Sequence, residues 1–124
     1  MLQRSTVIAA AWLEIVVGAI FVALPNIPCV LLFAERPEGV AILLARFAGL
    51  GLLGLGIACL PSPTTVSRRG VVGLLVFNVG VTALLGWIGF ATSFHGILLW
   101  PIVILHGVIA TALMPQAMTN KGWE

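Results

Sequence analysis

The chain has 124 residues, of which 60% are hydrophobic and only 8% are charged. Soluble domains carry about 25% charged residues, so this chain has more apolar surface than one small core could bury away from water. Its net charge of +2 is too small and too scattered for a nucleic-acid-binding surface. These figures exclude an ordinary soluble domain and a nucleic-acid partner. They predict a single integral membrane domain over residues 1–124, surrounded by the lipid bilayer.

Four long apolar runs are separated by short segments rich in Pro, Ser, Thr and charged residues. Each run is close to the roughly 20 residues that an α-helix needs to cross about 30 Å of hydrocarbon. Helices also satisfy their own backbone hydrogen bonds, as lipid-exposed segments must. We therefore predict an all-α membrane protein with a four-transmembrane-helix bundle, its helices at about residues 6–24, 39–60, 71–90 and 96–114.

The first apolar run has an alternative interpretation as a cleavable signal peptide. Arg4 precedes an apolar stretch, which is the order of such a peptide. Glu14 interrupts the stretch, however, and no small-residue cleavage site follows it. The sequence therefore favours a retained membrane helix.

The connection over residues 25–38 contains a short apolar stretch of its own. Asn26 is a candidate helix cap, and Pro28 suits the first turn of a helix. The apolar residues 29–34 end before Arg36 and are too few to cross the membrane. We predict a short interfacial helix between the first two membrane helices, folded over the bundle as a lid or docked against a partner.

Basic residues are concentrated at one side of the predicted bundle. Arg4 precedes the first helix, Arg68 and Arg69 lie between the second and third, and Lys121 lies in the tail. Cytoplasmic segments of membrane proteins carry an excess of Lys and Arg. We therefore predict that both termini are cytoplasmic, in a bacterial inner membrane.

The residues that commonly hold cofactors or metals are few and far apart. Cys29 and Cys59 fall on opposite sides of the predicted membrane, so they cannot form a disulfide within one chain, and neither has metal-ligand spacing. His95 and His106 fall at different depths, which disfavours a haem held by two histidines. The sequence contains no nucleophile motif. We predict no cofactor, no metal site and no enzymatic activity.

Each predicted membrane helix contains one strongly polar residue: Glu14, Arg46, Asn78 and His106. Counting about 1.5 Å per residue from the helix midpoints places all four within roughly 5 Å of the bilayer centre. Charges at that depth cost several kcal/mol unless they are paired, so we predict a buried polar layer with an ion pair between Glu14 and Arg46.

The role of this layer is open. The ion pair is either a structural device or a working site, and Asn78 is best interpreted as a hydrogen-bonding link between helices. His106 is either satisfied by a hydrogen bond or acts as a proton relay beside the carboxylate.

Small residues lie at helical spacing from the two charged residues of the layer. Ala11 and Gly18 share a face of the first helix with Glu14, and Gly49 and Gly56 share a face of the second with Arg46. Small residues let two helix backbones approach closely in lipid. We predict that these faces pack against each other.

The second predicted helix carries the segment Leu43–Leu52, LLARFAGLGL, and a glycine-rich continuation to Ala58. This segment resembles small bacterial four-helix membrane proteins of the DoxX-like kind. The resemblance implies a four-helix bundle that serves in some cases as a membrane component of redox or respiratory assemblies. It implies no catalytic residue.

The first predicted helix carries the segment Ala11–Gly18, AWLEIVVG. This segment is similar to the first helix of the small multidrug resistance transporters, which work as dimers around a carboxylate. The similarity implies that Glu14 is a proton and cation site. The chain departs from that family in having no Tyr and in offering Arg46 as a partner that would neutralise the carboxylate.

The leading hypothesis is a non-enzymatic accessory or structural subunit of a larger membrane complex of redox, respiratory or photosynthetic type. Its partners would be other membrane-protein subunits and lipid or pigment-like ligands, since the chain has little mass outside the membrane and much apolar surface. The alternative hypothesis is a dimeric proton-coupled transporter of small molecules that uses Glu14.

Overall fold

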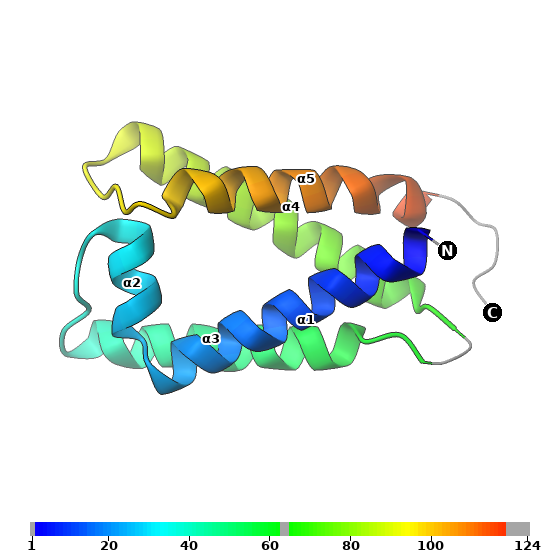
Figure 1. Cartoon of the computed structure of the whole chain (residues 1–124), viewed down its shortest axis with the longest axis horizontal. Helices are drawn as coiled ribbons and strands as arrows, with labels where there is room; N and C mark the ends of the chain where they lie inside the picture. Colours follow the sequence, from blue (N-terminus) through cyan, green and yellow to red (C-terminus); the bar gives the residue numbers. More distant parts are fainter. Residues whose placement is uncertain (1, 63–64, 119–124) are drawn as a thin grey trace.

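The computed structural model describes residues 2–62 and 65–118. Four helices in these ranges are long and apolar enough to cross a membrane, and a shorter helix lies between the first two (Figure 1). The predicted all-α fold is therefore confirmed, and the chain is an integral membrane protein. The helices are α1 (Leu2–Ala23), α2 (Asn26–Phe33), α3 (Val40–Cys59), α4 (Arg68–Ala91) and α5 (Leu99–Met118).

The four long helices are arranged as two tight pairs. α1 packs along α3 and α4 packs along α5, whereas contacts between the two pairs are much sparser. The pairs meet at the end that holds the start of α1 and the end of α5, and they separate towards the end that holds α2 (Figure 1). We call these the closed end and the open end.

The hydrophobic core lies at the closed end. Two arginines link neighbouring segments at this end by hydrogen bonds. Arg4 of α1 donates to the Ser62 carbonyl after α3 at 3.2 Å, and Arg68 of α4 donates to the Ala117 carbonyl of α5 at 3.4 Å. The core therefore joins the two pairs at one end only. Its buried side chains come from the starts of α1 and α4 and the ends of α3 and α5, and they are Val7, Ala10, Ala11, Cys59, Val71, Leu74 and Leu113.

Three membrane helices, α1, α4 and α5, extend beyond at least one of their predicted bounds, and the reasons are identifiable for α4 and α5. α4 begins at Arg68 because the Ser67 hydroxyl caps it, accepting a hydrogen bond from a backbone N–H of the first turn. α5 continues through Pro115 to Met118, and the Arg68 guanidinium satisfies the carbonyl of Ala117 in this last turn. Capping by side chains from outside the apolar runs sets these bounds.

Glycine brings α1 and α3 into close contact. A Cβ on Gly18 would lie 2.7 Å from the carbonyl oxygen of Gly49, and a Cβ on Gly56 would lie 2.6 Å from that of Ala11. Both distances are shorter than real Cβ contacts, so only glycine fits. The prediction that these small residues form the packing face is confirmed.

α2 begins one residue earlier than predicted. Pro25 is its N-cap residue and Asn26 is the first helical residue, so the prediction that Asn26 caps this helix is wrong. Pro28 does lie in the first turn, where its missing N–H costs nothing. Ala34, in the left-handed conformation at φ 59°, ends the helix.

α2 lies across the open end and is held to the start of α5 (Figure 1). The backbone N–H of Gly96 donates to the Leu32 carbonyl at 2.9 Å, and that of Leu98 donates to the Leu31 carbonyl at 2.8 Å. These bonds satisfy carbonyls at the end of α2 that have no partner within the helix. A Cβ on Gly96 would collide with the backbone of Leu31 and Leu32. The short helix thus folds over its own bundle as a lid.

Candidate functional site

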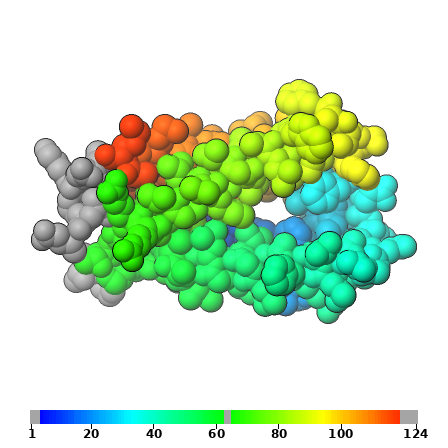
Figure 2. Space-filling view, turned by 180° about the vertical axis from the view of Figure 1, so that it is seen from behind, coloured from blue at the N-terminus to red at the C-terminus, as the bar shows by residue number. Residues whose placement is uncertain are grey.

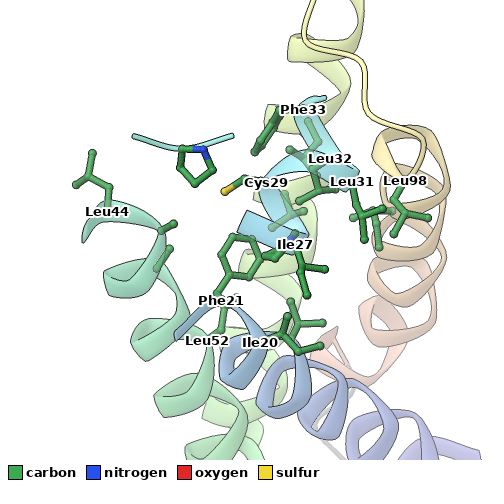
Figure 3. A pocket seen from close by; sticks show the side chains of 18 of the residues that line it. Ile20, Phe21, Ile27, Cys29, Leu31, Leu32, Phe33, Leu44, Leu52 and Leu98 are labelled. Carbon is green, nitrogen blue, oxygen red and sulfur yellow. The ribbon is translucent and has the colours of Figure 1, made fainter. Parts of the chain in front are cut away.

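A pocket of about 1110 Å³ lies between the two helix pairs at the open end. Apolar side chains from α1, α2, α3 and the segment before α5 surround its outer part, among them Phe21, Leu31, Leu52 and Leu98 (Figure 3). In the four membrane helices, every lining residue except Glu14 and His106 is apolar or glycine. The site is therefore an apolar chamber with two polar groups in its membrane-helix walls, and the charged residues Glu35, Arg36 and Glu38 line it from the connection between α2 and α3.

The pocket opens sideways between α3 and α4. Figure 2 shows this opening between the two helices, beside α2. Ala48 and Gly51 of α3 and Leu84 of α4 line the pocket and are exposed. A Cβ on Gly51 would have no atom within 4 Å. Since α3 and α4 are membrane helices, this opening faces the hydrocarbon of the bilayer.

Glu14 lies at the inner end of the pocket, next to the core of the closed end. Its side chain is 1% exposed, and its Oε1 atom is buried without a hydrogen-bond partner. Within residues 2–62 and 65–118, no ion pair involves this carboxyl group. Burying an unpaired polar group costs several kcal/mol in an apolar medium. This costly arrangement marks Glu14 as a candidate binding group.

Arg46 does not join the layer that the sequence predicted. Its side chain is exposed, whereas Ala45 and Gly49 of the same helix are buried. The face of α3 that packs against α1 contains Gly49, whose added Cβ would lie 2.8 Å from the Gly18 carbonyl oxygen, and this rotation of the helix leaves Arg46 outside the contact. Arg46 lies six residues from the start of α3 at Val40, about 9 Å along the axis, so its long side chain can extend towards the membrane surface.

Asn78 and His106 join the two helices of the α4–α5 pair. The Asn78 Nδ2 donates to the Leu74 carbonyl at 2.7 Å, and the Asn78 Oδ1 lies 2.7 Å from the His106 Nδ1. Because the Leu74 carbonyl can only accept, Oδ1 is the atom that faces the ring, and Nδ1 must carry the proton. The ring of Phe77 packs edge-on against His106 with centroids 5.9 Å apart. The imidazole is thus fixed in one tautomer.

This tautomer determines what His106 offers to the pocket. With its proton on Nδ1, the neutral ring has a lone pair on Nε2, which takes part in no hydrogen bond within the described segments. His106 and Glu14 both line the pocket, so its inner end presents hydrogen-bond acceptors. The described residues contain no group of three His, Cys, Asp or Glu that could hold a metal ion. The arrangement is suited to holding an apolar molecule with a polar end.

Sequence reasoning missed the walls of the pocket. Ala41, Ala45 and Ala48 recur at helical spacing on α3 and line the pocket, where their short side chains leave space. The stripe of small residues on α3 was the only sequence pattern that could have indicated the pocket. The same pattern also predicts close helix packing, as between α1 and the glycines of α3. A single sequence does not distinguish a pocket wall from a close helix contact.

Comparison with known proteins gives no match: no protein-family model matches the chain, and no curated protein or solved structure is significantly similar to it. The resemblances to DoxX-like proteins and to small multidrug resistance transporters stay predictions. The function must therefore be argued from the site itself.

Proposed function

We propose that this membrane protein holds a small lipid-soluble molecule between its two helix pairs and serves, without enzymatic activity, as an accessory subunit of a larger membrane assembly. The observation that carries the proposal is the apolar pocket of about 1110 Å³. Sites for small molecules in proteins have volumes of roughly 300 to 1,000 Å³ and mostly apolar walls. A molecule of that size and solubility fits this chamber.

The position of the pocket supports uptake from the bilayer. The opening between α3 and α4 lies on the lipid-facing side of the bundle (Figure 2). At the membrane surface, the lid helix α2 covers the chamber. A lipid-soluble molecule can therefore enter without passing through water, which fits a pigment, an isoprenoid or a lipid better than a water-soluble metabolite.

The outer surface of the bundle supports a role beside other membrane helices. Large apolar side chains project from it, including Phe47 at 75%, Phe90 at 84% and Ile97 at 79% exposure. Such surfaces pack against lipid or against other subunits. We propose a bacterial inner membrane, with the closed end and both termini cytoplasmic because Arg4, Arg68 and Arg69 lie there. Lys121, the remaining residue of that prediction, lies outside the described residues.

Ligand binding can be tested with two glycines of α3. Gly51 lines the pocket, Gly54 does not, and a Cβ on either glycine meets no atom within 4 Å. Gly51→Phe should therefore fill the opening, while Gly54→Phe should only add a ring on the lipid side. We expect native mass spectrometry of the full chain from mild detergent to show a bound apolar molecule in the wild type and in Gly54→Phe, and to show its loss in Gly51→Phe. Equal occupancy in all three proteins would contradict the proposal.

The accessory role has a separate test. The full chain, carrying an affinity tag and expressed in its own host, is purified in mild detergent. We expect a larger assembly with other membrane subunits in fixed stoichiometry. Recovery of the chain alone, with no subunit in fixed ratio, would contradict the accessory role.

A second candidate function is a dimeric proton-coupled transporter that uses Glu14. The observation that favours it is the exposed position of Arg46, which leaves the Glu14 carboxyl without the neutralising partner that the sequence predicted. In this case Glu14→Gln would abolish proton-driven uptake of organic cations into proteoliposomes. If neither the wild type nor the variant takes up organic cations, transport of those cations is excluded.

A further inference from the structure

We propose that the molecule bound in the pocket carries a hydroxyl group, and that this group forms a hydrogen bond with Glu14 at the inner end. The inference rests on the proposed binding function and adds the chemical class of the ligand. That class is an uncharged molecule with a long apolar body and one terminal alcohol or phenol group.

Glu14 supplies the first step of the argument. Its Oε1 is buried without a partner, in a pocket whose membrane-helix walls are otherwise apolar except for His106. This oxygen is already buried by the protein while the pocket is empty, so it carries the desolvation cost of a buried polar group, and an apolar ligand without a polar group would leave it unsatisfied. A ligand that places a polar hydrogen there removes that cost. The pocket therefore favours a ligand with one polar end directed inwards.

His106 defines the direction of the hydrogen bond. Its Nδ1 donates to Asn78, so the ring nitrogen left for a ligand, Nε2, accepts. A ketone, an ester or an ether has acceptors only and cannot bond to that lone pair. A hydroxyl group has the donor that both pocket residues can use.

The walls argue for a neutral donor over a charged one. The charged lining residues Glu35, Arg36 and Glu38 belong to the connection between α2 and α3, whereas in the membrane helices apolar side chains and glycine form the pocket apart from Glu14 and His106. A charge placed among them is costly even when it is paired. A hydroxyl donates to the carboxylate or to the carbonyl oxygen of the carboxylic acid, whereas an ammonium group brings a full charge that only the carboxylate would balance.

The test uses three probes with the same isoprenoid body: farnesol, farnesyl methyl ether and farnesylamine. Saturable binding of each to the full chain in dodecyl maltoside is measured by displacement of radiolabelled farnesol. A net hydrogen bond of about 1 to 1.5 kcal/mol corresponds to roughly tenfold in affinity. We therefore expect the wild type to bind farnesol about tenfold more tightly than the ether, and more tightly than the amine.

Two variants separate the hydrogen bond from partitioning into the micelle, which is the same for all proteins. Glu14→Leu removes the oxygen, and we expect the preference for farnesol over the ether to fall by about tenfold. Glu14→Gln keeps a side-chain carbonyl that accepts, so it should retain most of the preference. Circular dichroism and gel filtration check that both variants fold.

The outcomes distinguish this inference from the function on which it rests. Saturable binding of farnesol and its ether with equal affinity in the wild type would overturn the hydroxyl inference and leave the binding function intact. Tighter binding of farnesylamine would also overturn it, in favour of a cation site. No saturable binding of any probe, together with no bound molecule in the purified wild type, would overturn the binding function itself.

Discussion

The closed and open ends of the bundle are built from the same four helices with opposite results. At the closed end, Val71, Leu74 and Leu113 are 0% exposed. At the open end, the side chains leave a pocket of about 1110 Å³ and a separate helix, α2, is needed to cover it. The difference indicates that the closed end holds the fold together and that the open end is free to bind.

Contacts within a helix pair and contacts between the two pairs also differ in how closely the backbones approach. Close packing of α1 on α3 depends on glycine, where Gly56 meets the backbone of Ala11. The pocket instead separates the pairs along α3 and α4, and its lid is tied to the rest of the chain by backbone hydrogen bonds at Gly96 and Leu98. Regions with few buried contacts open at low free-energy cost, and binding sites are drawn from them. The comparison therefore predicts that global stability responds to the closed end and ligand access to the open end.

The largest effect on stability is expected at Gly56. Its added Cβ in Gly56→Ala would lie 2.6 Å from the Ala11 carbonyl oxygen, and backbone atoms cannot move aside. We expect a loss of about 1 to 3 kcal/mol in the free energy of unfolding, measured by SDS titration with circular dichroism. The control is Gly54→Ala, where the Cβ meets open space. There the higher helix propensity of Ala should raise the free energy of unfolding by roughly 0.5 to 1 kcal/mol. Equal effects of the two changes would contradict glycine-mediated packing.

A smaller loss of stability is expected when the hydrogen bond between Asn78 of α4 and His106 of α5 is removed. Asn78→Leu removes the acceptor of the His106 Nδ1–H and leaves that donor buried, at a cost of about 1 to 2 kcal/mol in the free energy of unfolding. Adding His106→Leu removes the orphaned donor, so the double variant should recover part of the loss. The coupling energy in this cycle should be about 0.6 to 1.7 kcal/mol. A coupling energy of zero would show that the hydrogen bond contributes nothing to the pair.

The lid should respond to change with little effect on global stability. Burial raises the pKa of the Cys29 thiol on α2, and the thiolate is the form that reacts. At neutral pH Cys29 should therefore react with iodoacetamide more slowly than an exposed thiol, and its rate should rise only at more alkaline pH. Gly96→Ala, which forces α2 away from the start of α5, should accelerate the reaction and leave the unfolding transition close to that of the wild type. Unchanged labelling in this variant would show that α2 is not held at Gly96.

Cys59, at the closed end, serves as the internal control for the labelling experiment. It is buried in the core between the helix pairs, so Gly96→Ala should leave its reactivity unchanged. An equal acceleration at Cys59 would show that the whole bundle had loosened, and the separation of the two ends would then be wrong.

The sequence predicted those parts of the fold that depend on one helix or one contact between neighbours. Hydropathy located the four membrane helices, and the spacing of Ala11, Gly18, Gly49 and Gly56 located the α1–α3 contact. Both follow from local periodicity, which a single chain displays directly.

The parts that sequence reasoning missed depend on the rotation and separation of whole helices. Equal depth, and a helix face shared with Gly49 and Gly56, placed Arg46 beside Glu14. Residues at equal height in different helices share a layer whichever way they point, and a shared face does not fix the rotation of a helix to within one residue. The rotation of α3 is set by Gly49 and Gly56 against α1, and it leaves Arg46 exposed. The pocket likewise arises from the separation of the two pairs, which no single helix encodes.

The weakest coupling is expected between Glu14 and Arg46, the two residues that the sequence paired. The Arg46 side chain is exposed and Glu14 Oε1 has no partner, so Glu14→Leu and Arg46→Leu should change the free energy of unfolding independently. Their effects should add to within about 0.5 kcal/mol in the double variant, as they do for sites without shared contacts. A buried ion pair would behave differently, because removing one partner would strand the other charge at a cost of about 3 to 5 kcal/mol. Recovery of stability in the double variant would therefore show that Arg46 turns inwards to Glu14, and additive effects would leave the carboxyl free for a ligand.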